Sequence, residues 1–233
     1  MKKLLSIVAL SAIITSISCK KNNVEPDVTN VSTAYKVFLI EYTSTGCGPC
    51  GTYGYPAFKE TYEKYPNEVT GIKISTGWSG SVAGVSEISS FHGFSGTPDA
   101  AVNEGKSMYP NAKTFANFAI NARGVKAKAG VGISKTISGN TVEIKTKTVF
   151  FEDVSGDYNL ALYVVENGIM ATQSGISGGP VAHNNVLRGL PNGAFGVNIA
   201  SSPSQGTVID GTYSYTVKGS IKNPDNIQVV AVI

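Results

Sequence analysis

The cysteines are the residues with the clearest potential for chemistry. The chain of 233 residues has three of them, Cys19, Cys47 and Cys50. Thiolates act as nucleophiles and as metal ligands, and two residues separate Cys47 from Cys50. A zinc site would need two further ligands, and the only histidines, His92 and His183, lie in different halves of the chain. We therefore predict no metal and no organic cofactor, and we interpret the cysteine pair through thiol chemistry.

The first cysteine ends a targeting segment. A basic start at residues 1–3 precedes an apolar stretch from Leu4 to Ile17, and Ser18 is a small residue just before Cys19. The stretch is too short to span a bilayer. The segment resembles bacterial lipoprotein signals, which implies a signal peptide over 1–18, acylated Cys19 holding the protein to a lipid bilayer, and a polar, flexible tether over 19–34. The alternative is an ordinary secretory signal with an incidental free cysteine.

A lipid on Cys19 would change the interpretation of the other two cysteines. Cys47 and Cys50 would then be the only thiols in an exported, disulfide-permissive protein, and they could pair only with each other. A ring closed over four residues removes little entropy from the unfolded chain, so such a bridge is a poor structural staple. Redox exchange is the more natural use.

Composition narrows the function classes. The chain is 42% apolar and 15% charged, which is typical of a folded protein with a substantial core. Lys and Arg number 19 against 16 Asp and Glu, and removal of Lys2 and Lys3 with the signal would leave 17 against 16. This nearly equal number of positive and negative side chains argues against nucleic-acid binding.

The elements that would position the cysteines follow from apolar spacing. The run Val37 to Ile40 is typical of a strand buried on both faces and leads directly into the cysteines. A helix is expected from Cys50 to before Pro66, with Pro56 bending it or marking its regular start. A strand over 69–74, a short helix over 85–91, a hairpin over 99–109 and a helix capped by Asn111 complete a β-α-β-α-β-β-α order.

These residues carry a family resemblance. The segment from Glu41 to Cys50, which ends in Cys-Gly-Pro-Cys, resembles the thioredoxin active site, and Gly96-Thr97-Pro98 before a strand resembles the cis-proline loop of that family. The resemblance covers residues 35–128. It implies an α/β thioredoxin-like domain with a mixed central sheet flanked by helices.

The chemistry of each cysteine can be stated separately. A thiol at a helix N-terminus has its thiolate stabilised by free backbone N–H groups and the helix dipole, so Cys47 is the predicted nucleophile. Cys50, one turn further into the helix, is the predicted resolving thiol. Gly48 and Pro49 keep the turn tight, since proline fits the first turn of a helix.

The resemblance implies two further roles, one for Glu41 and one for the residues that contact substrate. Glu41 would be a buried acid that moves protons to and from the resolving cysteine, because burial raises the pKa of a carboxyl. The alternative is that Glu41 only forms hydrogen bonds or points to solvent. Thr97-Pro98, if cis, would pair its backbone with an extended substrate, so Gly48, Pro49, Thr97 and Pro98 are the predicted substrate contacts.

The sequence departs from the thioredoxin pattern beside the cysteines. Gly46 replaces an aromatic residue, Gly51 replaces a basic one, and Thr43 stands where the family has tryptophan. Thiolate stabilisation and client docking are therefore expected to differ from those of thioredoxin. His92 and Trp78 are weaker candidates for the rim of the site, and packing is the alternative for His92.

After residue 128 the helical patterns stop. Alternating strands over 131–148, a strand from Tyr158 to Glu166, a turn at Asn167-Gly168, and strands over 206–218 and 227–233 predict an all-β, immunoglobulin-like sandwich domain over 129–233. The glycine-rich loop 174–185 lies between them. In or beside it, His183 and Arg188 could bind a carboxylate or glycan, and the alternative is that they only form hydrogen bonds within the edge of the sandwich.

The stretch from His183 to Gly189 extends the resemblance to the whole chain. Together with the signal and the thioredoxin-like region it is similar to a family of Gram-negative outer-membrane lipoproteins. This implies a lipid-anchored protein of the cell envelope, on the periplasmic or the surface face of the outer membrane.

Two functions remain open at this point. The first is a membrane-tethered thiol-disulfide oxidoreductase that acts on cysteine-containing exported proteins or a redox partner protein. The second is a redox-inert binding or adhesion lipoprotein that keeps a thioredoxin-like scaffold.

Overall fold

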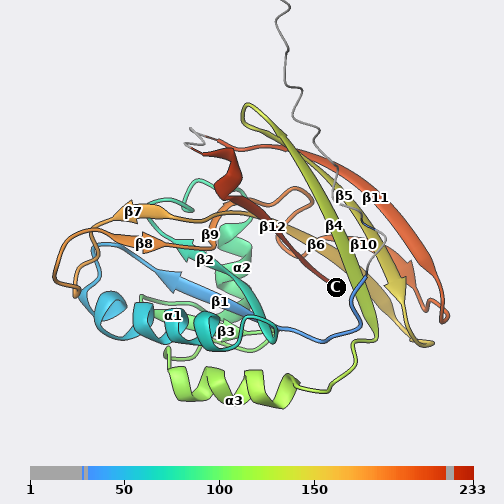
Figure 1. Cartoon of the computed structure of the whole chain (residues 1–233), viewed down its shortest axis with the longest axis horizontal. Helices are drawn as coiled ribbons and strands as arrows, with labels where there is room; N and C mark the ends of the chain where they lie inside the picture. Colours follow the sequence, from blue (N-terminus) through green and yellow to red (C-terminus); the bar gives the residue numbers. More distant parts are fainter. Residues whose placement is uncertain (1–27, 29–30, 219–222) are drawn as a thin grey trace, which may run out of the picture.

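The computed structural model describes Val28, residues 31–218 and residues 223–233. The predicted signal peptide and acylated Cys19 lie outside these residues. The first part of the chain alternates strands and helices (Figure 1). Its elements are β1 (Val37–Thr43), a π-helical segment (Cys50–Gly54), α1 (Tyr55–Lys64), β2 (Val69–Ser75), α2 (Val85–His92), β3 (Asp99–Val102) and α3 (Ala112–Ala122).

The second part consists of strands and one short 3₁₀ turn. Its elements are β4 (Ala129–Ser138), β5 (Thr141–Phe150), β6 (Asp157–Glu166), β7 (Ile169–Ala171), β8 (Val181–His183), β9 (Val186–Gly189), β10 (Val197–Ser201), β11 (Val208–Thr216), the turn Pro224–Asn226 and β12 (Ile227–Val232). Among the described residues, no helix is long and apolar enough to cross a membrane.

One seven-stranded mixed sheet runs through most of the molecule. Its strand order is β10-β6-β9-β2-β1-β3, and β12 also pairs with β6. β1 pairs in parallel with β2 and antiparallel with β3. β9 joins β2 in parallel through the pair Lys73 and Val186, and β6 continues antiparallel to β9. Strands from both sides of the predicted boundary at residue 128 therefore share one sheet, and the division into two domains stays a prediction.

Strand β1 is buried on both faces, as its continuous apolar run predicts. Val37 and Leu39 pack with Phe58 of α1 and Phe115 of α3 on one face. On the other face, Phe38 and Ile40 belong to a core that includes α2 and reaches β6 and β9. The alternation of side chains along β1 thus sends its odd-numbered residues toward α1 and α3.

The far end of the sheet is covered by a second, three-stranded sheet in the order β11-β5-β4 (Figure 1). Apolar residues of β5, β6 and β12 fill the space between them, including Val142, Leu162 and Ile227. The chain therefore has the two predicted β layers, but one layer is the end of the shared sheet. The β layers of the predicted sandwich are therefore present, and its immunoglobulin-like topology and its separation as a domain stay predictions.

The reason for this sharing is visible in β6. Leu160, Leu162 and Val164 face the three-stranded sheet, whereas Tyr163 and Val165 face the core beneath α2. A strand that is apolar on both faces is buried on both faces, so β6 contributes to both cores.

The hairpin predicted over 99–109 is shortened, and the predicted turn at Asn167-Gly168 does not lead to a strand that pairs with β6. Residues 106–109 contribute only an isolated bridge between Ala100 and Met108, so the expected second strand is missing. After Asn167-Gly168 the chain does not return along β6. It leaves the sheet as β7, which pairs antiparallel with β8. We call residues 169–183 the β7–β8 arm, and its loop lies beside the start of helix α1 (Figure 1).

Candidate redox-active site

Cys47 and Cys50 form a disulfide with their Cα atoms 5.2 Å apart. The pair lies where the chain leaves β1 and enters the helix, as the sequence predicts. Cys50 is completely buried, whereas Cys47 is partly exposed. Of the two sulfur atoms, that of Cys47 is therefore the one that an incoming molecule can reach.

The helix start places backbone donors around this sulfur. The Cys50 N–H donates to Sγ of Cys47 at 3.1 Å. The following turn is wide, because the Tyr55 N–H donates to the carbonyl of Cys50, five residues earlier. Pro56 has no N–H that could donate to a helix hydrogen bond, which a residue in the first turn of a helix does not need. Regular α-helix begins at Tyr55, next to the proline, as the sequence predicts. Such π turns often occur at functional sites.

The Thr97-Pro98 peptide bond is cis and meets the disulfide from another part of the chain. The carbonyl oxygen of Thr97 lies 3.4 Å from Sγ of Cys47. Pro98 also packs against the helix at Gly54, where an added Cβ would lie 3.2 Å from Cβ of the proline. The structure thus brings together the two motifs that the sequence predicts as one site.

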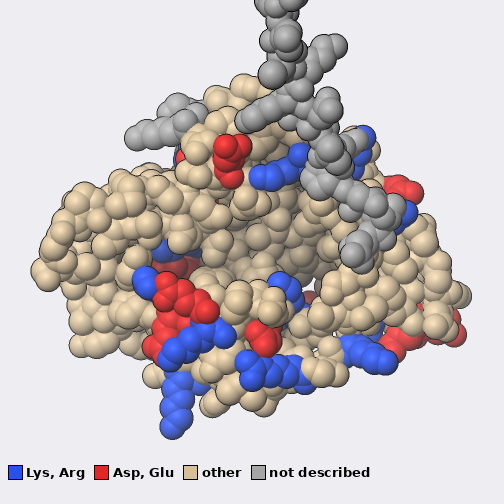
Figure 2. Space-filling view, viewed as in Figure 1, with Lys and Arg blue, Asp and Glu red and all other residues tan. Residues whose placement is uncertain are grey.

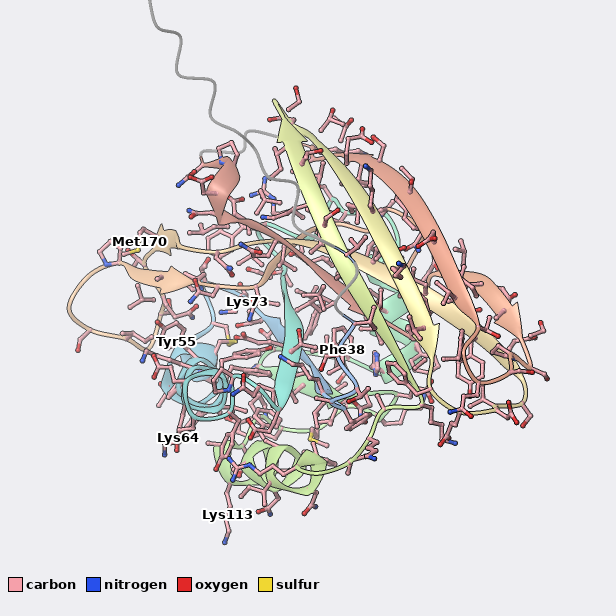
Figure 3. All side chains as sticks on the ribbon, turned by 45° about the vertical axis from the view of Figure 1, so that its right-hand side comes forward. Phe38, Tyr55, Lys64, Lys73, Lys113 and Met170 are labelled. Carbon is pink, nitrogen blue, oxygen red and sulfur yellow. A yellow bond between two sulfur atoms is a disulfide. The ribbon has the colours of Figure 1, made fainter. Side chains whose placement is uncertain are left out.

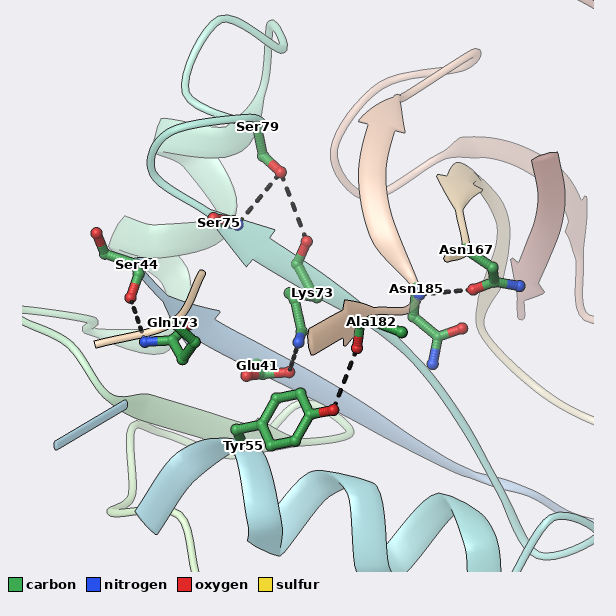
Figure 4. Close-up of polar contacts among 10 residues, drawn as sticks. All are labelled: Glu41, Ser44, Tyr55, Lys73, Ser75, Ser79, Asn167, Gln173, Ala182 and Asn185. Atoms are coloured by element: carbon green, nitrogen blue, oxygen red, sulfur yellow. Dashed lines mark hydrogen bonds and ion pairs between the residues drawn. The ribbon is translucent and has the colours of Figure 1, made fainter. Parts of the chain in front are cut away.

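Glu41 is 3% exposed on β1, and its partner on β2 is Lys73. Nζ of Lys73 lies 3.1 Å from a carboxylate oxygen of Glu41, as Figure 4 shows. Burial raises the pKa of Glu41, and the charge and hydrogen bond of Lys73 only oppose this effect. The solvent-exposed alternative for Glu41 is wrong. In Figure 3, Lys73 lies inside the fold, whereas Lys64 and Lys113 extend outward from their helices.

A cleft of about 690 Å³ reaches this ion pair from the surface. It lies between α1, β2 and the β7–β8 arm, and its lining includes Glu41, Lys73, Tyr55, Tyr62 and Asn185. Glu41 thus borders a cleft that opens to the surface, although its side chain is almost completely buried. No three potential metal-ligating His, Cys, Asp or Glu side chains gather anywhere in the part of the chain that the structure describes.

The β7–β8 arm covers the start of the helix. Gln173 is 2% exposed, and its Nε2 lies 3.0 Å from the carbonyl oxygen of Cys47 and 3.1 Å from that of Ser44. Figure 4 shows the contact with Ser44. The Ser174 N–H donates to the carbonyl of Thr45 at 2.8 Å. The arm therefore fixes the backbone on both sides of Gly46.

Two glycines allow the arm to approach so closely. A Cβ on Gly51 would lie 2.1 Å from the carbonyl oxygen of Ser174, and a Cβ on Gly175 would lie 2.2 Å from that of Gly48. Gly175 also has φ of +89°, which disfavours other residues. The missing basic side chain at position 51 is thus explained, because the arm occupies its space.

His183 at the end of the arm is buried between rings. Its ring makes edge contacts with Trp78 and Tyr55, at centroid distances of 5.0 and 6.0 Å. Burial and the nearby charge of Lys73 lower the pKa of His183 to about 4, with the Ala171 backbone opposing. The Tyr55 hydroxyl donates to the carbonyl of Ala182. His183 is therefore packed between the two rings, and Trp78, which packs against it, is half-buried.

The remaining candidates have packing partners. Nδ1 of His92 lies 2.6 Å from the carbonyl oxygen of Gly105, and its ring stacks on Phe94. Arg188 forms a largely buried ion pair with Glu166 across β9 and β6. These contacts support the structural alternative for His92 and Arg188.

Sequence reasoning missed Lys73 and Gln173. Lys73 could have been found only from the register between β1 and β2, which places it beside Glu41. No sequence pattern marked Gln173 as a site residue. It lies 123 positions after Cys50, and the local sequence does not show that this segment folds back over the cysteines.

Fold and site together define a mixed α/β protein with many strands, few helices and a Cys-x-x-Cys disulfide beside a cis-proline loop. The family model of outer membrane protein Omp28 matches residues 86–233, well over half of the chain, and the chain therefore belongs to this family of outer membrane proteins. The match includes Pro98 and the β7–β8 arm but starts after the disulfide.

A solved structure shares this fold. HBP35 of Porphyromonas gingivalis is similar with a TM-score of 0.71 and 16% sequence identity, over 87% of this chain and 70% of that one. No curated protein matches the chain.

Proposed function

We propose that the protein is a thiol-disulfide oxidoreductase of the cell envelope that exchanges disulfides with cysteine-containing exported proteins. One observation carries the proposal. A partly exposed Cys47 sulfur, bonded to buried Cys50 at a helix start, lies 3.4 Å from the carbonyl of a cis Thr97-Pro98 bond. This combination supports attack at Cys47 with an extended chain held along the cis-proline loop.

The proposed oxidation of a client consists of two thiol-disulfide exchange steps. A client thiolate attacks Sγ of Cys47, the bond to Cys50 breaks, and Cys50 leaves as a thiolate that takes up a proton. A second client thiolate then attacks the client sulfur of the mixed disulfide and releases the Cys47 thiolate. The client gains a disulfide, and the two electrons now on the protein pass to a redox partner protein. The same steps in reverse reduce a client with electrons from that partner.

Glu41 serves in this proposal as the group that holds the proton exchanged with Cys50. Burial raises the pKa of Glu41 and Lys73 opposes that rise, so the carboxyl keeps its proton to a higher pH than an exposed glutamate does. The cleft beside the pair supports the role, because the arm covers the helix start and Glu41 needs another route to solvent.

The proposed setting is the outer membrane, with the chain held by lipid on Cys19 and acting on its periplasmic or surface face. Membership of an outer membrane protein family supports this setting. Labelling cells with a fatty-acid analogue tests the anchor. Label that persists in a Cys19→Ala variant would contradict it.

Reduction of insulin by dithiothreitol tests the proposed activity. The mature protein should accelerate turnover, Cys47→Ser should abolish the acceleration, and Cys50→Ser should trap a mixed disulfide and turn over slowly. Equal turnover in all three forms would falsify the proposal.

A redox-inert binding lipoprotein with a thioredoxin-like scaffold is the second candidate. The arm that covers Gly48 and Gly51 and the cleft of about 690 Å³ favour it, because both give the scaffold surfaces that exchange does not need. Failure of the insulin test with a folded protein would leave this function.

A further inference from the structure

Two large aromatic side chains stand exposed on the segments that adjoin the cis-proline loop. Tyr53 is 55% and Tyr109 is 56% exposed, and their ring centroids are 6.1 Å apart. They come from different elements, the wide helical turn after Cys50 and the segment after β3. We call this pair the tyrosine ledge.

The ledge borders the cis-proline loop. Tyr53 directly precedes Gly54, the residue that packs against Pro98. Tyr109 directly follows Met108, whose backbone exchanges two hydrogen bonds, of 2.8 and 2.9 Å, with Ala100 two residues beyond Pro98. Both rings are therefore attached to backbone that contacts or flanks the proline beside Cys47.

The β7–β8 arm makes this side of the disulfide the available one. Residues 173–175 lie over Gly48, Gly51 and Thr52, where the backbone of Gly175 comes within van der Waals contact of Gly48. The arm carries no charged side chain, and in Figure 2 its surface is uncharged. The carbonyl of Thr97 lies 3.4 Å from Sγ of Cys47 on the side that these arm contacts do not cover, so we place an incoming chain along Thr97 and Pro98.

The chemistry of the ledge fits one kind of occupant. Exposed tyrosine rings pack well against aromatic and bulky apolar side chains. Such side chains are mostly buried in a folded client protein and are exposed in an unfolded one. We propose that the tyrosine ledge binds a bulky apolar side chain close to the reacting cysteine of an unfolded exported polypeptide. This inference rests on the proposed function and names its substrate class.

A peptide series tests the ledge. Each peptide has one cysteine as a mixed disulfide with glutathione and one Phe placed one or two residues before or after that cysteine. A Ser peptide and glutathione disulfide serve as references. The pre-reduced protein should react with the best Phe peptide about 3- to 10-fold faster than with the Ser peptide, which is the size expected of an aromatic contact.

Matched variants locate the effect. Tyr53→Ala with Tyr109→Ala should remove the Phe preference and leave the rate with glutathione disulfide within about twofold, whereas the double Phe variant should retain the preference. Phe118→Ala serves as the control, because Phe118 is 37% exposed on α3 and has no part in the ledge. Circular dichroism confirms that each variant is folded.

The outcomes separate the two proposals. Equal rates for all peptides, or a Phe preference that survives the double Ala variant, overturn the ledge and leave the oxidoreductase function intact. No reaction of the wild-type protein with any disulfide overturns both.

Discussion

The two ends of the shared sheet are built differently. At the end that carries the disulfide, charged and polar groups are buried in specific pairs, including Glu41 with Lys73 and Gln173 with the Cys47 carbonyl. At the end beneath β4, β5 and β11, the core is chiefly apolar, as Leu162 and Ile144 illustrate. The disulfide end therefore has buried polar contacts that fix the positions of particular groups, whereas the other end has an apolar core that stabilises the fold.

The difference has an energetic basis. Apolar burial stabilises by about 25 cal/mol per Å² and needs no particular partner. Burial of a charge costs free energy that a single ion pair often fails to repay. The pair of Glu41 and Lys73 is therefore a poor source of stability, which agrees with the proton-transfer role proposed for Glu41. Substitutions at the apolar end should change stability alone, and substitutions at the disulfide end should change reactivity.

The largest expected effect on stability is at the apolar end. Leu162→Ala removes a fully buried side chain and should lower the free energy of unfolding by about 2 to 5 kcal/mol. Urea denaturation measures this loss. Insulin turnover per folded molecule should be unchanged, and a fall beyond the unfolded fraction would contradict the separation of the two ends.

The next effect tests the contact between the arm and the helix. Gly51→Lys introduces the kind of side chain that thioredoxins have there, but Cβ would meet the Ser174 carbonyl, so the arm must move. We expect a loss of about 2 to 3 kcal/mol and faster proteolysis within 172–180. Gly46→Lys is the matched control, since an added Cβ there has only Ser44 Oγ at 4.0 Å. Equal free energies of unfolding for the two variants would show that the arm does not pack closely against the helix at Gly51.

A pH effect should come from His183. Its pKa is lowered from 6.5 to about 4 on folding, so between these values the unfolded chain binds more protons. This contribution to stability is present above pH 6.5 and is lost as the pH falls toward 4, on the order of 2 kcal/mol between pH 7 and 4.5. His183→Phe keeps a ring beside Trp78 and should flatten the dependence. Parallel pH profiles for wild type and variant would disprove the assignment.

The smallest effect should follow from loss of the Gln173 contacts. Gln173→Ala removes hydrogen bonds to the carbonyls of Ser44 and Cys47 and should cost about 1 to 2 kcal/mol. Because these carbonyls flank the reacting sulfur, the redox potential of the disulfide should also shift. Gln173→Glu should be worse, since a carboxylate cannot donate to carbonyl oxygens. A change in stability with an unchanged potential would make Gln173 a purely structural residue.

Much of the disulfide end could be predicted from sequence, because its signals are local. The cysteine spacing, the apolar run of β1 and Thr97-Pro98 indicate the elements and their order, and the structure has them there. Gly51 was interpretable only as a departure from a pattern. Its reason, the Ser174 carbonyl above it, depends on a contact across more than 120 residues.

The path of the chain after β6 was harder to predict for a related reason. Asn167-Gly168 has the composition of a tight hairpin turn, yet its partners are Asn184 and Asn185, which bind it from the other end of the β7–β8 arm. The residues of a turn indicate the local backbone conformation, but they do not indicate with which strand the following segment pairs. For the same reason the joining of β6 to β9 and β2 was not visible in the sequence.

Alkylation of the reduced protein tests the central claim most directly. Limiting iodoacetamide at pH 6.5, followed by mass spectrometry, reports which thiol reacts first in the wild-type chain. Because Cys47 is partly exposed and receives the Cys50 N–H, the account predicts modification of Cys47 about tenfold or more ahead of buried Cys50. Equal labelling of the two thiols, or faster labelling of Cys50, would contradict it.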